Sequence, residues 1–350
     1  MVSILAVALE VMLILIIVGI ANGAMSDNGR RLAGVGGDII MRPPNSGILA
    51  SLSSASMPVA IGEKIAKEIP GVKAVTPVVT MLNSEGNIET IYGIDPVSFQ
   101  AVGGPLVYLK GGLFTGPDEI VVDDIWSAAN HAAVGDEVEV LSQKFKVAGI
   151  VEHGRGARVY APLSRLQEMI GSPNKASMFF IRTNTPQDVD AVVKQLKTVF
   201  HDYKLDNARD LTSLMSTDKI PGVDIALRGV VIVAVCIGVL VIFLSVYTTI
   251  TERTREIGIL RSLGASKSFV VWLILEESMV LCLLGVGVGF VGSQLLAAIL
   301  HGVFPTLPLQ ITGDWRLKAA VFAIVSGVIG SLYPSLKASA QDPIEALAYE

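Results

Sequence analysis

The hydrophobic residues of this 350-residue chain are concentrated towards its two ends. Long uncharged runs lie before residue 22 and after residue 228, and the part between them has the composition of a soluble domain. A helix needs roughly 17 to 25 mostly apolar residues to cross a bilayer. Four segments meet this test, and we expect membrane-spanning helices at residues 1–21, about 229–250, about 268–300 and about 317–336.

Residues 22–222 lie between the first two helices and predict a mixed α/β domain, large enough for two lobes. Strands are expected at Val72–Met81, Ile88–Ile94, Glu119–Val122, Glu137–Leu141, Phe145–Val151 and Ser177–Thr183. Helices are expected at Met57–Glu68, Asp124–Ala133, Leu163–Ile170 and Thr185–Phe200, the last starting near Pro186 with Asp188 and Asp190 in its first turn. The expected fold class is an integral membrane α-helical protein with four transmembrane helices and a mixed α/β extracytoplasmic domain between helices 1 and 2.

The composition, with 51% hydrophobic and only 17% charged residues, agrees with a membrane setting. A cleaved signal peptide is the alternative for the first segment. We prefer an uncleaved helix, because Glu10 would lie inside the apolar region, which is longer than the usual ~7 to 15 residues of a signal peptide. The lack of any basic residue ahead of it leaves open whether Met1 is the natural start.

The orientation follows from the short loops, because cytoplasmic loops carry an excess of lysine and arginine. Loop 251–268 has four basic residues, whereas loop 301–315 has none before Arg316. We therefore expect the segment 251–267, both termini and the tail 337–350 to be cytoplasmic. Residues 22–222 are then extracytoplasmic.

A charged, helix-prone segment follows the second membrane helix. Its charged residues cannot lie in hydrocarbon, and they are Glu252, Arg253, Arg255, Glu256 and Arg261. At helical spacing the same segment carries an apolar stripe made of Ile257, Ile259, Leu260 and Leu263. This combination predicts a short amphipathic helix that docks a soluble partner.

Three acidic residues lie inside the predicted membrane helices, where charges are costly and usually face a bundle interior or an interface. Glu276 and Glu277 are adjacent and near the cytoplasmic end of the third helix, so they cannot share one face. Glu10 is expected to be protonated or paired with a donor. A proton relay is a less favoured alternative, since no ladder of further acids or histidines continues the path.

Small residues recur every four positions in the third helix, at Gly285, Gly289 and Ser293. This spacing is typical of closely approaching membrane helices. We expect a matching surface on the fourth helix, made by Ser326 with Gly330 and by Gly327 with Ser331.

Candidate catalytic or metal-binding chemistry is sparse. The four histidines, His131, His153, His201 and His301, lack metal-ligand spacing. Both cysteines, Cys236 and Cys282, lie in predicted membrane helices and are expected to be structural. The chain has no Gly-x4-Gly-Lys-Ser/Thr phosphate loop and no Gly-x-Ser-x-Gly elbow.

Two polar motifs in the insert also have ordinary explanations. Val151–Gly156 contains an acid, a histidine and an arginine, but it is rich in glycine and is expected to be a solvated loop. Asp123 and Asp124 are expected to be acids at the start of a helix. We therefore expect no catalytic residues, no metal, no cofactor and no nucleic-acid partner for this chain.

The order of these segments resembles the MacB/FtsX-type ABC transporter permease family across essentially the whole chain. The most specific match is the run Thr-Glu-Arg-Thr-Arg-Glu-Ile-Gly-Ile-Leu-Arg-Ser-Leu-Gly-Ala after the second helix, which includes Gly258 and Gly264. Weaker matches lie in the expected order at Asp118–Asp123, Val134–Val138, Phe145–Val151, Tyr160–Leu163, Leu275–Ser278 with Glu277 matching the family glutamate, Leu284–Gly287, Pro334, Lys337, Ala338 and Asp342–Leu347. The chain departs from the family in carrying Glu10 in a helix that is usually uncharged, and in lacking basic residues before that helix.

The resemblance implies a MacB-like core domain at 22–222 and an FtsX-like permease domain at 223–350 in a bacterial cytoplasmic (inner) membrane. It implies that 251–267 couples to a separate cytoplasmic ATPase, which holds ATP and Mg²⁺ and whose motion the membrane helices transmit outwards. It also implies a second permease copy, identical or paralogous, and a possible periplasmic adaptor or lipoprotein, besides membrane lipids.

Two other functions remain open at this stage. One is an FtsX-like regulator of an extracytoplasmic cell-wall hydrolase, and the other is a membrane-anchored extracytoplasmic receptor or enzyme without an ATPase. The substrate is not identifiable from the sequence, because the insert shows neither a large aromatic cluster nor a concentrated charge patch.

Overall fold

The computed structural model describes residues 2–44, 55–83, 89–208 and 223–341. The chain forms two compact units. The first, here called the membrane unit, comprises Met1–Ala24, Thr217–Val303 and Leu307–Glu350. The second, the inserted unit, comprises Met25–Ser216 together with Phe304–Thr306.

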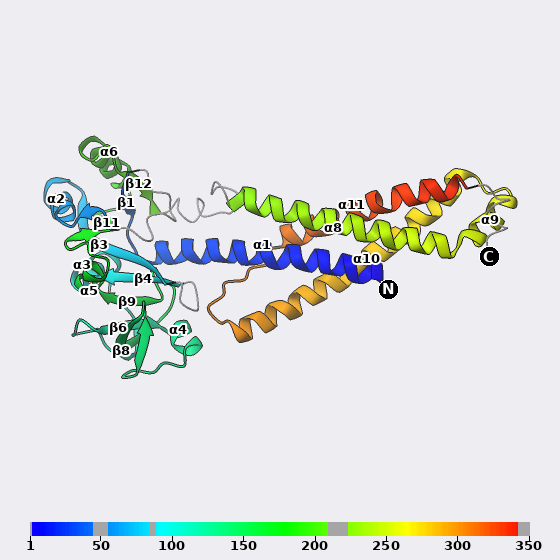
Figure 1. Ribbon diagram of the computed structural model, residues 1–350. Helices are drawn as coiled ribbons and strands as arrows, with labels where there is room; N and C mark the ends of the chain where they lie inside the picture. Colours follow the sequence, from blue (N-terminus) through cyan, green and yellow to red (C-terminus); the bar gives the residue numbers. More distant parts are fainter. Residues whose placement is uncertain (1, 45–54, 84–88, 209–222, 342–350) are drawn as a thin grey trace. The chain divides into compact units, whose positions relative to one another are not determined.

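Four long helices dominate the membrane unit (Figure 1): α1 (Val2–Gly34), which continues into the inserted unit, α8 (Val223–Glu252), α10 (Lys267–Val303) and α11 (Gly313–Ser339). Each is long and apolar enough to cross a membrane. The short helix α9 (Thr254–Ser262) lies at the turn between α8 and α10. The bundle core joins buried side chains of α1, such as Val11 and Ile14, to Ile242 of α8 and Ala323 of α11.

The four helices lie where the hydrophobic runs predict them, but all are longer than the apolar runs themselves. The difference is largest for α1, which was expected to end at residue 21 and continues to Gly34. Its last turns carry Asp27, Arg30 and Arg31, and hydropathy alone does not follow a helix into such a polar stretch. The predicted tail signature Asp342–Leu347 lies outside the described residues.

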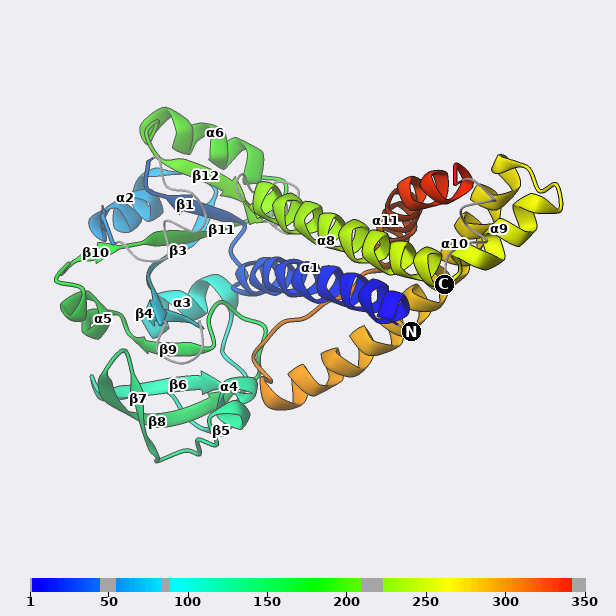
Figure 2. The ribbon, with the colours of Figure 1, turned by 45° about the vertical axis from the view of Figure 1, so that its right-hand side comes forward.

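A mixed ten-stranded sheet forms the centre of the inserted unit (Figure 2), in the order β12-β1-β11-β3-β4-β9-β6-β8-β5 with β7 pairing β8. Its strands are β1 (Ile39–Arg42), β3 (Val72–Asn83), β4 (Glu89–Ile94), β5 (Tyr108–Gly111), β6 (Glu119–Asp123), β7 (Glu137–Val140), β8 (Gln143–Val151), β9 (Val159–Pro162), β11 (Met178–Thr183) and β12 (Lys204–Asn207). Strand β9 is central, parallel to β4 and antiparallel to β6. Separate short strands β2 (Met57–Pro58) and β10 (Lys175–Ala176) pair with each other.

Within the residues that the structure describes, five short helices accompany the sheet: α2 (Ala60–Glu68), α3 (Pro96–Gly103), α4 (Asp124–Ala129), α5 (Leu163–Met169) and α6 (Val189–Val199). Two hydrophobic clusters form around the sheet. One contains Phe99, Tyr160 and Phe180, and the other contains Trp126 and Phe145. The ten-stranded sheet contributes residues to both clusters.

All six predicted strands are present, whereas three predicted helix starts or ends need correction. Met57 lies in β2, so α2 begins later than expected. Helix α4 ends at Ala129 and not at Ala133. Helix α6 begins at Val189, because the Asp188 side chain accepts hydrogen bonds from the Thr185 backbone N–H and hydroxyl and closes a turn that contains Pro186.

Candidate coupling site

Helix α9 is separated from α8 by Arg253 alone, so the chain turns without an intervening loop. The Thr254 hydroxyl donates to the backbone oxygens of Ile250 and Thr251, at 3.0 and 3.1 Å. At the other end, Gly264 has φ of +97°, a conformation that favours glycine. The Ala265 N–H bonds to Leu260 O and the Gly264 N–H to Arg261 O, which is the Schellman pattern that ends helices.

The predicted apolar stripe of α9 divides between two faces. Ile257 packs against the hydrophobic core of the membrane unit, next to the buried Thr254 and Gly258. Ile259 and Leu263 point away from the bundle, with 44% and 80% of their surface exposed. The stripe spans two faces because Ile259 follows Ile257 by two residues, about 200° around the helix, whereas Ile259 and Leu263 are about one turn apart.

The charged residues of the predicted coupling segment also have different surroundings. Glu252, Arg255 and Glu256 are exposed. Arg261 is only partly exposed and donates from Nη1 to Ala265 O at 3.2 Å, so it supports the turn after α9.

Arg253 connects the start of α9 to α10. Its Nη1 lies 3.3 Å from Oε1 of Glu277, and both side chains are about half exposed. The two residues border a small groove of about 100 Å³ that is also lined by Leu260 and Ser3. Glu276 is exposed as well, so neither adjacent acid points into the bundle interior.

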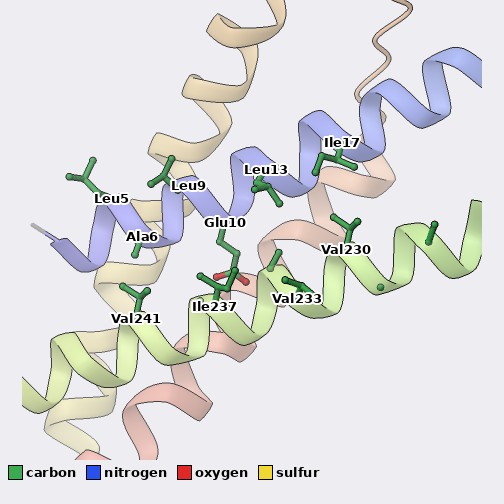
Figure 3. Close-up of a pocket in the computed structure, with 14 residues that line it drawn as sticks. Leu5, Ala6, Leu9, Glu10, Leu13, Ile17, Val230, Val233, Ile237 and Val241 are labelled. Atoms are coloured by element: carbon green, nitrogen blue, oxygen red, sulfur yellow. The ribbon is translucent and has the colours of Figure 1, made fainter. Parts of the chain in front are cut away.

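Glu10 is the acid that the bundle encloses. Only 6% of its surface is exposed, and Oε1 accepts a hydrogen bond of 2.8 Å from the Ser326 hydroxyl on α11. Within the described residues Oε2 has no hydrogen-bond partner. A Cβ added to Gly238 of α8 would lie only 1.9 Å from this oxygen, so Oε2 takes the space that a side chain there would need. Figure 3 shows the Glu10 side chain directed from α1 towards α8, beside an apolar groove of about 790 Å³ between these helices.

The glycine stripe of α10 makes a close helix contact, but with α1 and not with α11. A Cβ on Gly285 would lie 2.6 Å from Val7 Cβ, and one on Gly289 would lie 2.8 Å from Val11 Cβ. On α11, Gly327 lies against Cys282 of α10. A Cβ on Gly330 would meet Val239 O of α8 at 2.7 Å, while Ser293 is buried and donates to Phe290 O.

The inserted unit contains a buried ionic cluster that the sequence analysis does not predict. Asp123 caps α4, as its position before the helix suggests, by accepting from the Trp126 N–H at 2.7 Å. Its other oxygen, however, lies 3.3 Å from Arg158 and 3.5 Å from Arg31. These partners are 35 and 92 residues away in the chain, so no local pattern predicts them.

Glu89 lies near the same cluster and accepts hydrogen bonds from Asn83 and from the Trp126 ring N–H. Burial raises the pKa of Glu89, although these two hydrogen bonds and the charge of Arg158 oppose the shift. Proton uptake by Glu89 therefore begins at a higher pH than for a free glutamate.

Two family models together match most of the chain. The MacB-like periplasmic core domain matches residues 1–199, and the FtsX-like permease C-terminal domain matches residues 228–343. The chain belongs to the MacB/FtsX-type ABC transporter permease family. The permease is therefore a multi-pass membrane protein.

Curated relatives are similar at low identity. The uncharacterized ABC transporter permease YknZ of Bacillus subtilis is 29% identical over 236 residues, which cover 62% of the permease and 55% of the relative. The macrolide export ATP-binding/permease protein MacB of Rhodopseudomonas palustris is 23% identical over 317 residues, which cover 83% of the permease and 48% of the relative. The permease thus spans about half the length of these relatives.

Solved structures of extracytoplasmic domains are similar to part of the permease. The periplasmic region of MacB from Actinobacillus actinomycetemcomitans has a TM-score of 0.39 and 18% identity, covering 53% of the permease and 95% of that chain. The extracellular domain of YknZ has a TM-score of 0.38 and 18% identity, covering 48% and 99%.

Proposed function

We propose that this permease couples ATP hydrolysis by a separate cytoplasmic ABC ATPase to movement of its extracytoplasmic domain, for export or extraction of a substrate at the outer face of the membrane. The observation that carries the proposal is the two-sided packing of α9. One face of this helix belongs to the membrane bundle, and the other presents Ile259 and Leu263 to solvent.

The outer face of α9 suits a groove on a soluble partner. Two exposed aliphatic side chains beside the exposed Arg255 and Glu256 provide an apolar anchor with charges around it. Interfaces derive most of their affinity from such central anchors, while surrounding charges contribute to specificity and to the rate of association.

The inner face explains how a push on α9 would reach the membrane helices. Thr254 and Gly258 are buried against the bundle, and Ile257 packs into its core. Both ends of α9 are fixed to the neighbouring helices. The chain turns directly from α8 into α9, a Schellman turn leads to α10, and the Arg253–Glu277 ion pair joins the start of α9 to α10. Displacement of α9 would therefore move the adjoining ends of α8 and α10.

This proposal assigns cytoplasmic locations to α9 and both termini, and it requires partners. The ATPase would supply the ATP and Mg²⁺ sites, and two permease copies would face one pair of ATPase subunits. An adaptor or lipoprotein outside the membrane would select the substrate or receive it.

The proposal is tested by substituting the outer face of α9. We expect Leu263→Asp to abolish co-purification of an ABC ATPase with the tagged permease, because a buried carboxylate would replace the apolar anchor. The ATPase is identified by mass spectrometry of the wild-type preparation. Leu109→Asp, at a leucine with 54% exposure on β5, is the matched control and should leave co-purification intact.

Leu260→Asp tests the inner face of α9 separately from the outer face. Leu260 lines the groove within the bundle, so its substitution should lower the stability of the permease as well as its partner binding. Normal ATPase recovery with Leu263→Asp would exclude the outer face of α9 as the coupling surface.

A further inference from the structure

Four chain segments meet at a buried ionic cluster inside the inserted unit. Asp27 and Arg31 come from the last turns of α1, Asp123 comes from β6, and Arg158 comes from the segment before β9. The fourth segment is 304–306, whose Thr306 backbone oxygen accepts from Arg158 Nη2 at 3.3 Å.

Arg158, in the segment before β9, makes contact with the other three segments at once. Its Nη1 lies 3.3 Å from Asp123 Oδ2, and its Nη2 lies 3.6 Å from Asp27 Oδ2 as well as near Thr306 O. Arg31 closes the cluster through Asp27 at 2.7 Å and Asp123 at 3.5 Å. The planar guanidinium can serve several acceptors in fixed directions, which a lysine ammonium cannot do in the same way.

The charged side chains of the cluster are buried, so each needs its ion-pair partners. The side chains of Asp123, Arg31 and Arg158 are only 1%, 8% and 10% exposed. Charges withdrawn from water need their partners, so loss of one contact leaves an uncompensated charge in a dry site. The cluster therefore resists separation of the four segments.

Main-chain contacts also join the end of α1 to residues 154–156, next to the cluster. The Gly156 N–H donates to Arg31 O at 2.8 Å. A Cβ on Gly34, the last residue of α1, would lie 2.0 Å from Gly154 O. The end of α1 is thus held against the loop that leads to Arg158 by main-chain contacts as well as by charge.

Two of the four segments run directly into membrane-spanning helices. Helix α1 is one continuous helix from Val2 to Gly34, and segment 304–306 follows the end of α10 at Val303. We infer that the Asp27–Arg31–Asp123–Arg158 cluster is the joint through which movement of α1 and α10 enters the core domain, with Arg158 as its central positioning residue. This inference rests on the proposed function, and it adds the place where the motion leaves the membrane helices.

Hydrogen–deuterium exchange on the complete permease–ATPase complex tests the joint. Exchange is compared with and without a non-hydrolysable ATP analogue and Mg²⁺, for peptides around α9 and for peptides of the sheet between residues 89 and 208. In the wild type we expect nucleotide to change exchange in both sets.

Arg158→Lys keeps the charge but removes the simultaneous contacts. We expect nucleotide still to change exchange around α9, while the response of the sheet peptides is lost and basal ATP hydrolysis is unchanged. Arg165→Gln is the matched control, because Arg165 pairs with Asp118 and Glu168 at the surface of the same unit and does not belong to the cluster. It should retain both responses.

Asp27→Asn is a second test of the joint, for the case in which Arg158→Lys does not fold. Asp27 is 28% exposed, so its substitution disturbs the core less, yet it removes the carboxylate charge that pairs with both arginines. Thermal unfolding identifies which variants remain folded, and a full sheet response in a folded Arg158→Lys or Asp27→Asn variant overturns the joint. Failure of the proposed function gives a different result, because then the wild type shows no nucleotide response around α9.

Discussion

At the scale of single residues, the membrane bundle encloses one carboxyl group and gives it a hydrogen-bond donor, as the sequence analysis allowed. Glu10 reaches across to α11 through Ser326 and occupies the space that the missing side chain of Gly238 leaves on α8. One acid and one glycine thus fit together where α1, α8 and α11 meet. This fit gives Glu10 a structural role that does not depend on a proton path.

Gly238→Ala should destabilise the permease, because its Cβ would overlap Glu10 Oε2. Overfilling a packed site typically costs about 1–3 kcal/mol. Adding Glu10→Ala should restore much of the loss, as expected for directly coupled residues. Thermal unfolding of the purified permease measures both effects.

Gly229→Ala is the control on the same helix, since nothing lies within 4 Å of a Cβ there. It should leave stability unchanged or raise it. Equal effects at positions 238 and 229, or no recovery in the double variant, would contradict the proposed fit.

Residue types and spacing were informative about location but not about partners. The sequence was sufficient to place Glu10 inside a membrane helix and Asp123 before a helix. Ser326 and Arg158, which complete their surroundings, lie 316 and 35 residues away in the chain, and only the tertiary fold brings them together.

At the scale of elements, long apolar runs and β-branched segments were predicted well because their signals repeat over many residues. Short elements were missed where the signal is brief, as for β1 and β9 with four residues each. Helix α3 was also missed, although Asp95, Pro96 and Ser98 form a recognisable start. The Asp95 side chain accepts from the Ser98 N–H at 2.9 Å.

The small-residue stripe of α10 shows the same limit. Its spacing predicted close packing, but the spacing does not say which neighbouring helix approaches. The structure places α1 there, and it provides an internal comparison, because Gly285 and Gly289 face α1 while nothing lies within 4 Å of a Cβ on Gly287.

Substitution along this stripe should give effects of opposite sign. Gly285→Ala or Gly289→Ala should lower the unfolding temperature by forcing α1 away. Gly287→Ala should raise it slightly, since alanine favours helix over glycine by about 0.8–1.0 kcal/mol. Thermal unfolding in one detergent compares the three, and uniform effects would argue against close α1–α10 packing.

At the scale of the whole molecule, the proposed function requires α9 and the core domain to lie on opposite sides of the membrane. In the sequence, helix α8 lies between the core domain and α9, and its 30 residues extend about 45 Å, enough to cross a bilayer once. We therefore expect a single crossing between them. The basic residues around α9 then favour the cytoplasm for this helix.

Cysteine accessibility in spheroplasts tests this arrangement most directly. Leu263→Cys and Val97→Cys are made separately in a background with Cys236→Ala and Cys282→Ala, and each is exposed to a membrane-impermeant maleimide. The two positions are matched, with 80% exposure at Leu263 on the outer side of α9 and 79% at Val97 on α3. We expect Val97→Cys to react in intact spheroplasts and Leu263→Cys to react only after the membrane is permeabilised. Equally rapid labelling of Leu263→Cys in intact spheroplasts would put α9 on the outer side and contradict the coupling function.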